Sequence, residues 1–351
     1  MTMDLDFFRR LCESPAPTGF EGPLRTIVRE RLEPIGRPEA DPLGNVWIRS
    51  GGDGPQIVAV AHGDQIGLVI TWVDDQGFLS FERIGGVDRQ LLPGRRLTIH
   101  AAAGPVQGVV GRRPTHFIPA DERGKAPEFH EQYIDIGASS RKEALKRVSV
   151  GDPVTFAADF LELAPGVVAS QACDDRAGVY AACRALELYA AEPAASCLTT
   201  VITVHEETTF LGARAQAHRL RPDVVLVIDA DFATDQPDVD VKKAGGEVKL
   251  GAGPVLARGT GSNHRLLDRA QKIAKRAGIR CQVRASGGAT NTDADELMAA
   301  GRAATLSIGI PMRYMHSPYE VVNIDDIEAT AELVAAIARD LADIDDEEFL
   351  W

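Results

Sequence analysis

The stretch Thr199–Asp231, TTVITVHEETTFLGARAQAHRLRPDVVLVIDAD, decides the fold class of this chain. It begins with a β-branched apolar run that stops at His205-Glu206-Glu207, and its second apolar run stops at Asp229. Both runs have the length and composition of buried strands, and the residues between them suit a loop and a short helix. The pattern predicts strand, loop, helix and strand in succession, which is the repeating unit of an α/β sheet.

Three carboxylates stand where these two strands end: Glu206, Glu207 and Asp229. A carboxylate buried without a partner costs several kcal/mol, so these side chains do not belong to an apolar core. In an open α/β sheet, sites form beyond the carboxyl ends of parallel strands. We therefore expect the three carboxylates to surround one crevice. The alternative is that they are ordinary polar residues that end a strand and face water.

Another apolar run, residues 57–61, leads directly into His62-Gly63-Asp64. Its continuous apolar composition is typical of a parallel strand that is covered on both faces. If the tip stays extended, the side chains of His62 and Asp64 point to the same side. A carboxylate beside a metal-ligating histidine fixes the ring tautomer and raises its basicity, which is the role we predict for Asp64. The alternative is a histidine that only ends a strand.

Two later segments place potential ligands at junctions between elements. Asp174-Asp175 opens a long apolar helix, where one aspartate can cap the helix while the other binds a cation. His316 lies in a loop beyond a strand predicted over residues 304–308. Thr292-Asp293-Ala294-Asp295 is predicted to cap a short helix; Asp293 could be functional, but a helix cap explains it adequately.

Six side chains at such junctions form the candidate site. They are His62, Asp174, Glu206, Glu207, Asp229 and His316. Imidazole together with carboxylate suits zinc, cobalt or manganese rather than calcium, which avoids imidazole. A site for two metal ions needs a bridging carboxylate, terminal ligands on each ion and a free base. Of two adjacent glutamates, one can bind a metal while the other accepts the proton of the attacking water. The sequence therefore predicts two divalent ions per chain.

The pattern changes between about residues 67 and 165, where short strand-like runs alternate with turn signals such as Asp75-Gln76-Gly77 and Gly85-Gly86. Short strands at close intervals are typical of a small β-barrel or sandwich. We predict a mixed, largely parallel α/β sheet with flanking helices, formed by residues 1–68 and 166–351. Residues 69–165 are predicted to be an inserted, β-barrel-like domain.

Composition excludes several classes of function. The chain has 351 residues and a net charge of −13, which argues against nucleic acid as a partner. It has no apolar run long enough to span a membrane, and its first residues lack the pattern of a secretory signal. Its five cysteines are odd in number and show no CxxC spacing, which is typical of reduced thiols in a cytoplasmic protein.

Several of these segments, in this order and over nearly the whole chain, resemble the M42 metallo-aminopeptidases, the group of tetrahedral and glutamyl aminopeptidases. Each segment is short, but the order in which they occur is specific. The segments that carry the resemblance are Ala61-His62-Gly63-Asp64, Asp135-Ile136-Gly137-Ala138, Asp174-Asp175-Arg176, Glu206-Glu207 followed by Leu211-Gly212-Ala213, Ile228-Asp229, and residues 313–322, RYMHSPYEVV.

The resemblance implies a zinc-exopeptidase-like fold and a role for each residue of the site. Asp174 would bridge two metal ions and would be joined to its neighbour by a cis peptide. His62 and Asp229 would complete one metal site, and Glu207 and His316 the other. Glu206 would be the general base, and Asp64 would orient His62. The inserted domain would be the β-rich domain of the family, which helps to assemble dimers into a hollow dodecamer.

The predicted function is a cytoplasmic dinuclear aminopeptidase that removes N-terminal residues from short peptides. Two alternatives stay open: a metal-dependent amidase, deacylase or glycan-related hydrolase of the same fold, and a catalytically silent oligomeric binding protein. The chain departs from the family pattern at Gln65, where Glu is usual, and at His205 and Thr208-Thr209. These neighbours of the ligands would affect the choice of substrate rather than the hydrolysis.

Overall fold

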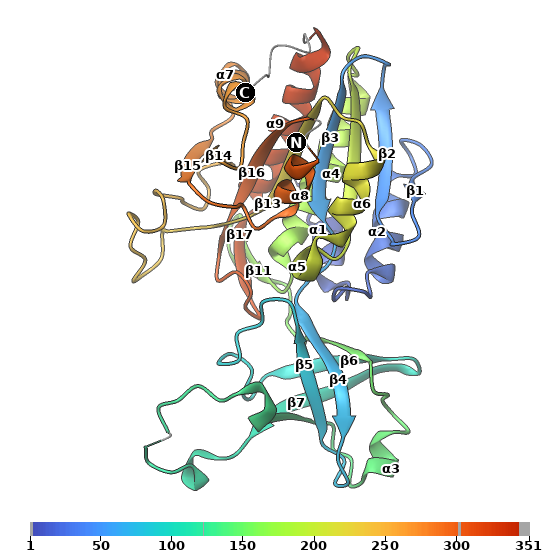
Figure 1. The fold of residues 1–351 in the computed structure, drawn as a ribbon, viewed down its shortest axis with the longest axis vertical. Coiled ribbons are helices and arrows are strands. Elements are labelled where there is room, and N and C mark those ends of the chain that lie inside the picture. Colours follow the sequence, from blue (N-terminus) through green and yellow to red (C-terminus); the bar gives the residue numbers. More distant parts are fainter. Residues whose placement is uncertain (1–2, 122, 301–302, 344–351) are drawn as a thin grey trace.

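Parallel strands form the centre of an eleven-stranded sheet in the computed structural model, which describes residues 3–121, 123–300 and 303–343 (Figure 1). The central strands, in spatial order, are β12 (Cys197–Thr203), β3 (Gln56–His62), β13 (Val224–Phe232) and β16 (Ala304–Arg313). Neighbouring members of this set are parallel, so their carboxyl ends meet at one edge of the sheet. The long apolar runs of the sequence therefore become the buried interior of the sheet, as predicted.

Antiparallel strands complete both sides of the sheet. On the side of β12 they are β2 (Val46–Gly51) and β1 (Glu39–Ala40), and on the side of β16 they are β17 (Glu320–Asn323), β11 (Val167–Ser170) and β10 (Leu161–Ala164). A further parallel pair, β14 (Val255–Gly259) and β15 (Gln282–Ser286), joins β16 through β14. The sheet is therefore mixed but parallel at its centre.

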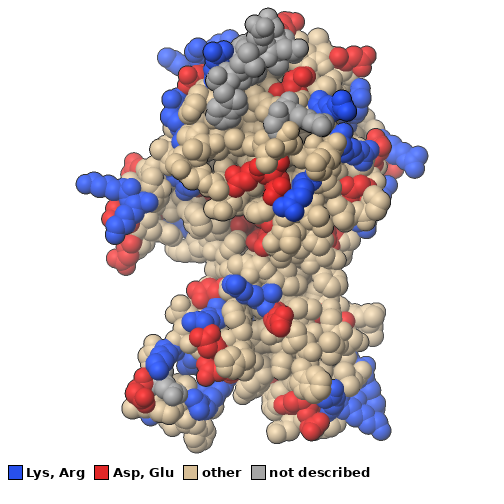
Figure 2. All heavy atoms as spheres, viewed as in Figure 1, with Lys and Arg blue, Asp and Glu red and all other residues tan. Residues whose placement is uncertain are grey.

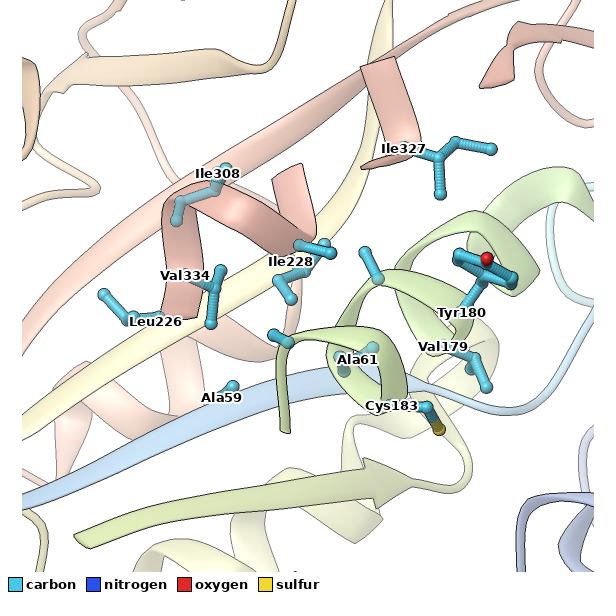
Figure 3. Close-up of a cluster of buried hydrophobic side chains, with 14 of the residues drawn as sticks. Ala59, Ala61, Val179, Tyr180, Cys183, Leu226, Ile228, Ile308, Ile327 and Val334 are labelled. Atoms are coloured by element: carbon cyan, nitrogen blue, oxygen red, sulfur yellow. The ribbon is translucent and has the colours of Figure 1, made fainter. Parts of the chain in front are cut away.

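Helices cover both faces of the sheet because the side chains of its strands alternate between two cores. Ala59 and Ala61 of β3 lie in one core, which is shared with α1 (Leu5–Glu13), α2 (Gly22–Leu32), α4 (Cys173–Ala191), α7 (His264–Ala277) and α9 (Ile324–Asp340). Val58 and Val60 lie in the other, with α6 (Leu211–Arg219) and α8 (Asp293–Ala299). Figure 3 shows part of the first core, where side chains of α4 and α9 lie over β3, β13 and β16.

The inserted segment folds into a closed barrel, drawn below the α/β domain in Figure 1. Its strands, in spatial order, are β4 (Gly67–Val73), β5 (Leu79–Ile84), β8 (Gln132–Asp135), β7 (Gly104–Arg112), β6 (Arg96–Ala101) and β9 (Pro153–Phe156). The barrel has an apolar core of its own and carries α3 (Arg141–Ala144), η1 (Thr115–Phe117) and η2 (Phe129–Glu131). The predicted fold class, an α/β sheet with a small inserted barrel, is confirmed.

The two remaining short elements are α5 (Glu206–Thr209), which follows β12, and η3 (Leu341–Asp343), which follows α9. Within the described ranges, none of the helices combines the length and the apolar composition that a membrane crossing requires.

Candidate metal centre

The predicted site residues come together at the carboxyl edge of the central strands. β3 ends at His62, and Asp229 lies near the end of β13. β12 ends at Thr203, and the chain then turns into α5, which begins with Glu206 and Glu207. Asp174 stands at the start of α4, and His316 lies in the loop between β16 and β17. Residues from five segments of the chain therefore meet in one cluster because parallel strands end side by side.

Asp174 lies between two halves of this cluster. Its Oδ1 is 3.2 Å from Nε2 of His62, and its Oδ2 is 3.3 Å from Nε2 of His316. On the first side, Nε2 of His62 also lies 3.7 Å from Oδ1 of Asp229. On the second side, Nε2 of His316 lies 3.3 Å from Oε2 of Glu207. The two oxygens of one carboxylate therefore face two separate groups of ligand-type atoms.

Charges in the cluster are out of balance in the absence of a cation. Burial, together with the charges of nearby carboxylates such as Asp229, raises the pKa of Glu206 to about 11, although His62 opposes the shift. Burial also raises the pKa of Glu207 to about 7. Burial disfavours the charged form of His316, yet Asp174 and Glu207 outweigh it and raise the pKa of this histidine to about 11. A divalent cation bound among these groups would favour their deprotonated forms and lower these pKa values.

Acidic side chains also gather on the surface of this region. On the face shown in Figure 2, they lie in the α/β domain just above the narrow junction with the barrel. An excess of negative charge of this kind attracts cations.

Divalent cations fit the side chains that are present. Donor atoms of His62, Glu206 and Asp229 all lie within 4.8 Å of one another, and so do those of His62, Asp174 and Glu207. Oε1 of Glu207 is buried without a hydrogen-bond partner, which leaves it free to bind an ion. Two imidazoles and several carboxylates are the ligands that zinc and related ions prefer. The donor set is therefore compatible with the two ions predicted from the sequence.

Asp64 lies behind the cluster and is fully buried. Its Oδ1 lies 3.6 Å from Nδ1 of His62, which is longer than a hydrogen bond, and this nitrogen is buried without a hydrogen-bond partner among the described residues, so the orienting role of Asp64 stays a prediction. The same carboxylate accepts hydrogen bonds from the backbone N–H groups of Glu206 and Glu207, at 3.0 and 3.1 Å. Burial alone would raise the pKa of Asp64, but His62, the hydroxyl of Thr18 and the amide of Glu206 lower it.

Glu320 supports the other side of the cluster and was not singled out from the sequence. Its Oε2 accepts from the backbone N–H of Asp174 at 2.9 Å, and its Oε1 accepts from that of His316 at 2.8 Å. One buried carboxylate therefore positions the backbones of two ligands. Glu320 follows His316 by four residues within the segment RYMHSPYEVV, and this short separation from a predicted ligand is the feature of the sequence that could have identified it.

The two aspartates that open α4 make different contacts. Oδ1 of Asp175 accepts from the backbone N–H of Gly178 at 2.9 Å and caps the helix, while Asp174 points into the cluster. The peptide bond between them is cis, as the family resemblance implied.

The interpretation of Asp293 as a helix cap is wrong. The helix α8 is capped by Thr292, whose side chain accepts from the N–H of Ala294. Asp293 is buried, and its Oδ2 accepts from the hydroxyl of Thr203 at 2.5 Å. Burial raises its pKa to about 7, and the charge of Asp229 adds to the shift. It therefore belongs to the buried acidic surroundings of the cluster rather than to a solvated helix end.

The unusual residues beside the ligands fall into two groups. Gln65 is only 2% exposed, and its Oε1 accepts from the N–H of Ala16 and from the guanidinium of Arg176. It therefore fixes the backbone behind the site, and its effect on the choice of substrate stays a prediction. Thr208 and Thr209 are exposed on α5, where contact with a substrate remains open to them.

A loop of the barrel reaches the cluster, although all the predicted ligands belong to the α/β domain. A Cβ atom on Gly86 would lie 2.4 Å from Nδ1 of His316. A Cβ atom on Gly85 would lie 3.3 Å from Oε2 of Glu207. Since real Cβ atoms do not approach other atoms so closely as the first distance, position 86 requires glycine in this arrangement. The turn signal Gly85-Gly86 was visible in the sequence, but its contact with the ligands was not.

Both the sequence and the fold of the chain are similar to those of known proteins. A family model described as M42 glutamyl aminopeptidase matches residues 44–333. The chain is 32% identical to the lysyl aminopeptidase of Pyrococcus furiosus, over 98% of this chain and 99% of the relative. A TET aminopeptidase from a marine sediment archaeon of the Thaumarchaeota superposes with a TM-score of 0.91 at 31% identity, covering 96% of both chains. The TET1 peptidase of Pyrococcus horikoshii superposes with a TM-score of 0.86 at 29% identity, covering 95% of this chain and 98% of the other. That peptidase can assemble into a tetrahedron or a large octahedral shell.

Proposed function

The chain belongs to the M42 glutamyl aminopeptidase family, and from this premise we propose which of its side chains carry out each part of the reaction. It is an aminopeptidase, a hydrolase that acts on N-terminal residues. Dependence on divalent metal ions is typical of the family. We assign His62 and Asp229 to one ion, Glu207 and His316 to a second, and Asp174 to both. The observation that carries this assignment is the position of Asp174, whose two oxygens face the two histidines at 3.2 and 3.3 Å.

The ions, when bound, would supply Lewis acidity that increases the acidity of a water molecule and polarises the scissile carbonyl. Glu206 is the general base in this proposal. It accepts a proton from the attacking water at a carboxylate oxygen and returns it to the nitrogen of the leaving amine. Asp64 holds the backbone of Glu206, and Glu320 holds those of Asp174 and His316. The short distance of 3.9 Å between Oε2 of Glu206 and Nε2 of His62 supports this role because it places the base beside a metal ligand.

The metal assignment predicts close to two ions per chain, with zinc, cobalt or manganese as the candidates. Chelated protein should be inactive on aminoacyl-nitroanilides and should recover with zinc or cobalt. Elemental analysis of reconstituted Asp174→Asn should give clearly less than the content of the wild type, since both ions lose a ligand. A full complement of two ions in this variant would contradict the bridging role. The same assay, run with different amino acids, measures the preferred N-terminal residue.

We also propose that the protein is a cytoplasmic homo-oligomer that acts on short peptides. The free cysteines, four of which are buried, support a reducing compartment. The barrel exposes large apolar side chains that suit contacts between copies. They include Trp72, Phe117 and Val150, which are 53%, 74% and 55% exposed. Light scattering of Phe117→Glu should show a smaller assembly than the wild type, and an unchanged mass would remove Phe117 from the interface.

A further inference from the structure

Glu206 and Glu207 stand on a turn that cannot fix its own geometry. The helix α5 has four residues, and it lies between His205 and Phe210, both with left-handed backbone angles (φ of 62° and 54°). Residues other than glycine adopt this conformation only when their surroundings hold them in it. Contacts from outside the turn must therefore determine where the two glutamates point.

Asp64 supplies the principal contact of this kind. Its Oδ1 accepts from the N–H of Glu206 and its Oδ2 from the N–H of Glu207, so one carboxylate holds both residues by their backbones. These N–H groups open a helix and have no partner within it. The orientation of the Asp64 carboxylate therefore sets the orientation of the turn.

Thr18 fixes that carboxylate in turn. Its hydroxyl donates to Oδ2 of Asp64 at 2.6 Å, and its side chain belongs to the loop between α1 and α2. The loop is itself fastened next to the site, because the N–H of Ala16 donates to Gln65 and Arg176 donates to the carbonyl of Ser14. The donor on Thr18 is thus held at a defined distance from Asp64.

We propose that Thr18 is a positioning residue: by donating to Asp64 it holds the carboxylate that places Glu206 and Glu207 in the metal centre. The inference rests on the roles proposed above for these two glutamates. Thr18 touches neither substrate nor metal in this scheme and acts only through Asp64. Removal of the hydroxyl leaves Asp64 with its two backbone donors and takes the shortest of these hydrogen bonds, 2.6 Å, away from Oδ2, the oxygen that also accepts from Glu207.

Matched variants separate positioning from simple stability. Thr18→Val keeps the shape and removes the donor, and Thr18→Ser keeps the donor. The control is Thr200→Val, because Thr200 is also buried and donates a hydrogen bond to the carbonyl of Ala182 at 3.0 Å, away from the cluster. If Thr18→Val does not fold, Thr18→Cys replaces it, since a thiol is only a weak donor.

In the reconstituted enzyme, Thr18→Val should lower kcat about 10- to 100-fold, as is usual for residues that orient a metal site, with KM and metal content close to those of the wild type. Thr18→Ser and Thr200→Val should keep kcat within about threefold. In chelated protein, the amides of residues 204–210 should exchange hydrogen roughly fivefold faster in Thr18→Val than in wild type or Thr18→Ser.

The inference is overturned if Thr18→Val retains kcat, if Thr18→Ser loses as much as Thr18→Val, or if exchange at residues 204–210 is unchanged. It is also overturned if Thr200→Val lowers kcat equally, because the effect would then be one of stability. Glu206→Gln tests the proposed function separately. Full activity of Glu206→Gln would refute the role of the base, whereas an inactive Glu206→Gln beside a fully active Thr18→Val would refute only the role of Thr18.

Discussion

Replacing Glu206 by glutamine should stabilise the metal-free protein at neutral and alkaline pH. Burial and the nearby carboxylates raise the pKa of Glu206 to about 11, and the residue is only 8% exposed. In the unfolded chain a glutamate titrates near about 4.3. Between these two values the folded state holds a proton that the unfolded state has released, so the free energy of unfolding falls as the pH rises.

The size of this fall in the free energy of unfolding follows from the single proton that Glu206 keeps in the folded state and releases on unfolding. The slope is about −1.4 kcal/mol per pH unit, and from about pH 6 to about pH 8 Glu206 alone lowers the free energy of unfolding by about 2.7 kcal/mol. Glutamine does not titrate, so Glu206→Gln should lack this part of the pH dependence. Urea unfolding of both proteins with a chelator, at two pH values and at fixed protein concentration, measures the difference.

Parallel pH dependences of the two proteins would refute the reasoning, because they would mean that Glu206 is ionised in the folded state even without cations. The metal-loaded variant provides an independent measurement. Glu206→Gln should bind the same amount of metal as the wild type, while kcat falls by about 10²- to 10⁴-fold. Loss of metal from this variant would show that Glu206 is a ligand and that the two glutamates have been assigned the wrong way round.

Glu207→Gln should bind metal more weakly than the wild type and therefore lose activity, which high metal concentration should partly restore. Metal titration measures this, and a normal metal affinity would exclude Glu207 as a ligand. Gly86→Ala should weaken metal binding about tenfold or more, since the new Cβ would lie 2.4 Å from the imidazole of His316. The control is Gly124→Ala, whose new Cβ would have no atom within 4 Å and which should bind metal as the wild type does. Burial raises the pKa of Asp231 to about 6 although Arg284, 2.5 Å away, opposes the shift, so the free energy of unfolding should fall as the pH rises from about 4 to about 6; Asp231→Asn should lack this part of the pH dependence, and identical pH dependences in urea unfolding would contradict this.

Local sequence patterns were sufficient to predict which residues lie together at the ends of the parallel strands. His62, Glu206, Glu207 and Asp229 each follow an apolar run, and parallel strands must end at the same edge, so their proximity could be predicted without coordinates. The change from strand–helix alternation to short strands likewise predicted the barrel, because the periodicity of side chains is a local property. That one of the two aspartates, Asp174 and Asp175, caps a helix also followed from the start of that helix.

The failures concern contacts between distant segments. Asp293 was assigned to a cap because a short helix follows it, yet Thr292 caps that helix and Asp293 bonds to Thr203, 90 residues earlier in the chain. The partner of Gln65 was not predicted either, since Arg176, 111 residues later in the chain, donates to its Oε1. In both cases the partner lies far away along the chain.

The sequence by itself determined which residue types stand at the carboxyl edge of the sheet, since apolar runs and the polar residues that end them are written along the chain. Only the tertiary structure decided how these side chains are held. Thr18 reaches Asp64 across 46 residues, Asp64 reaches Glu206 across 142, and Glu320 reaches Asp174 across 146. A hydrogen bond requires a donor and an acceptor within about 3 Å, and no local pattern specifies which distant segments packing brings that close.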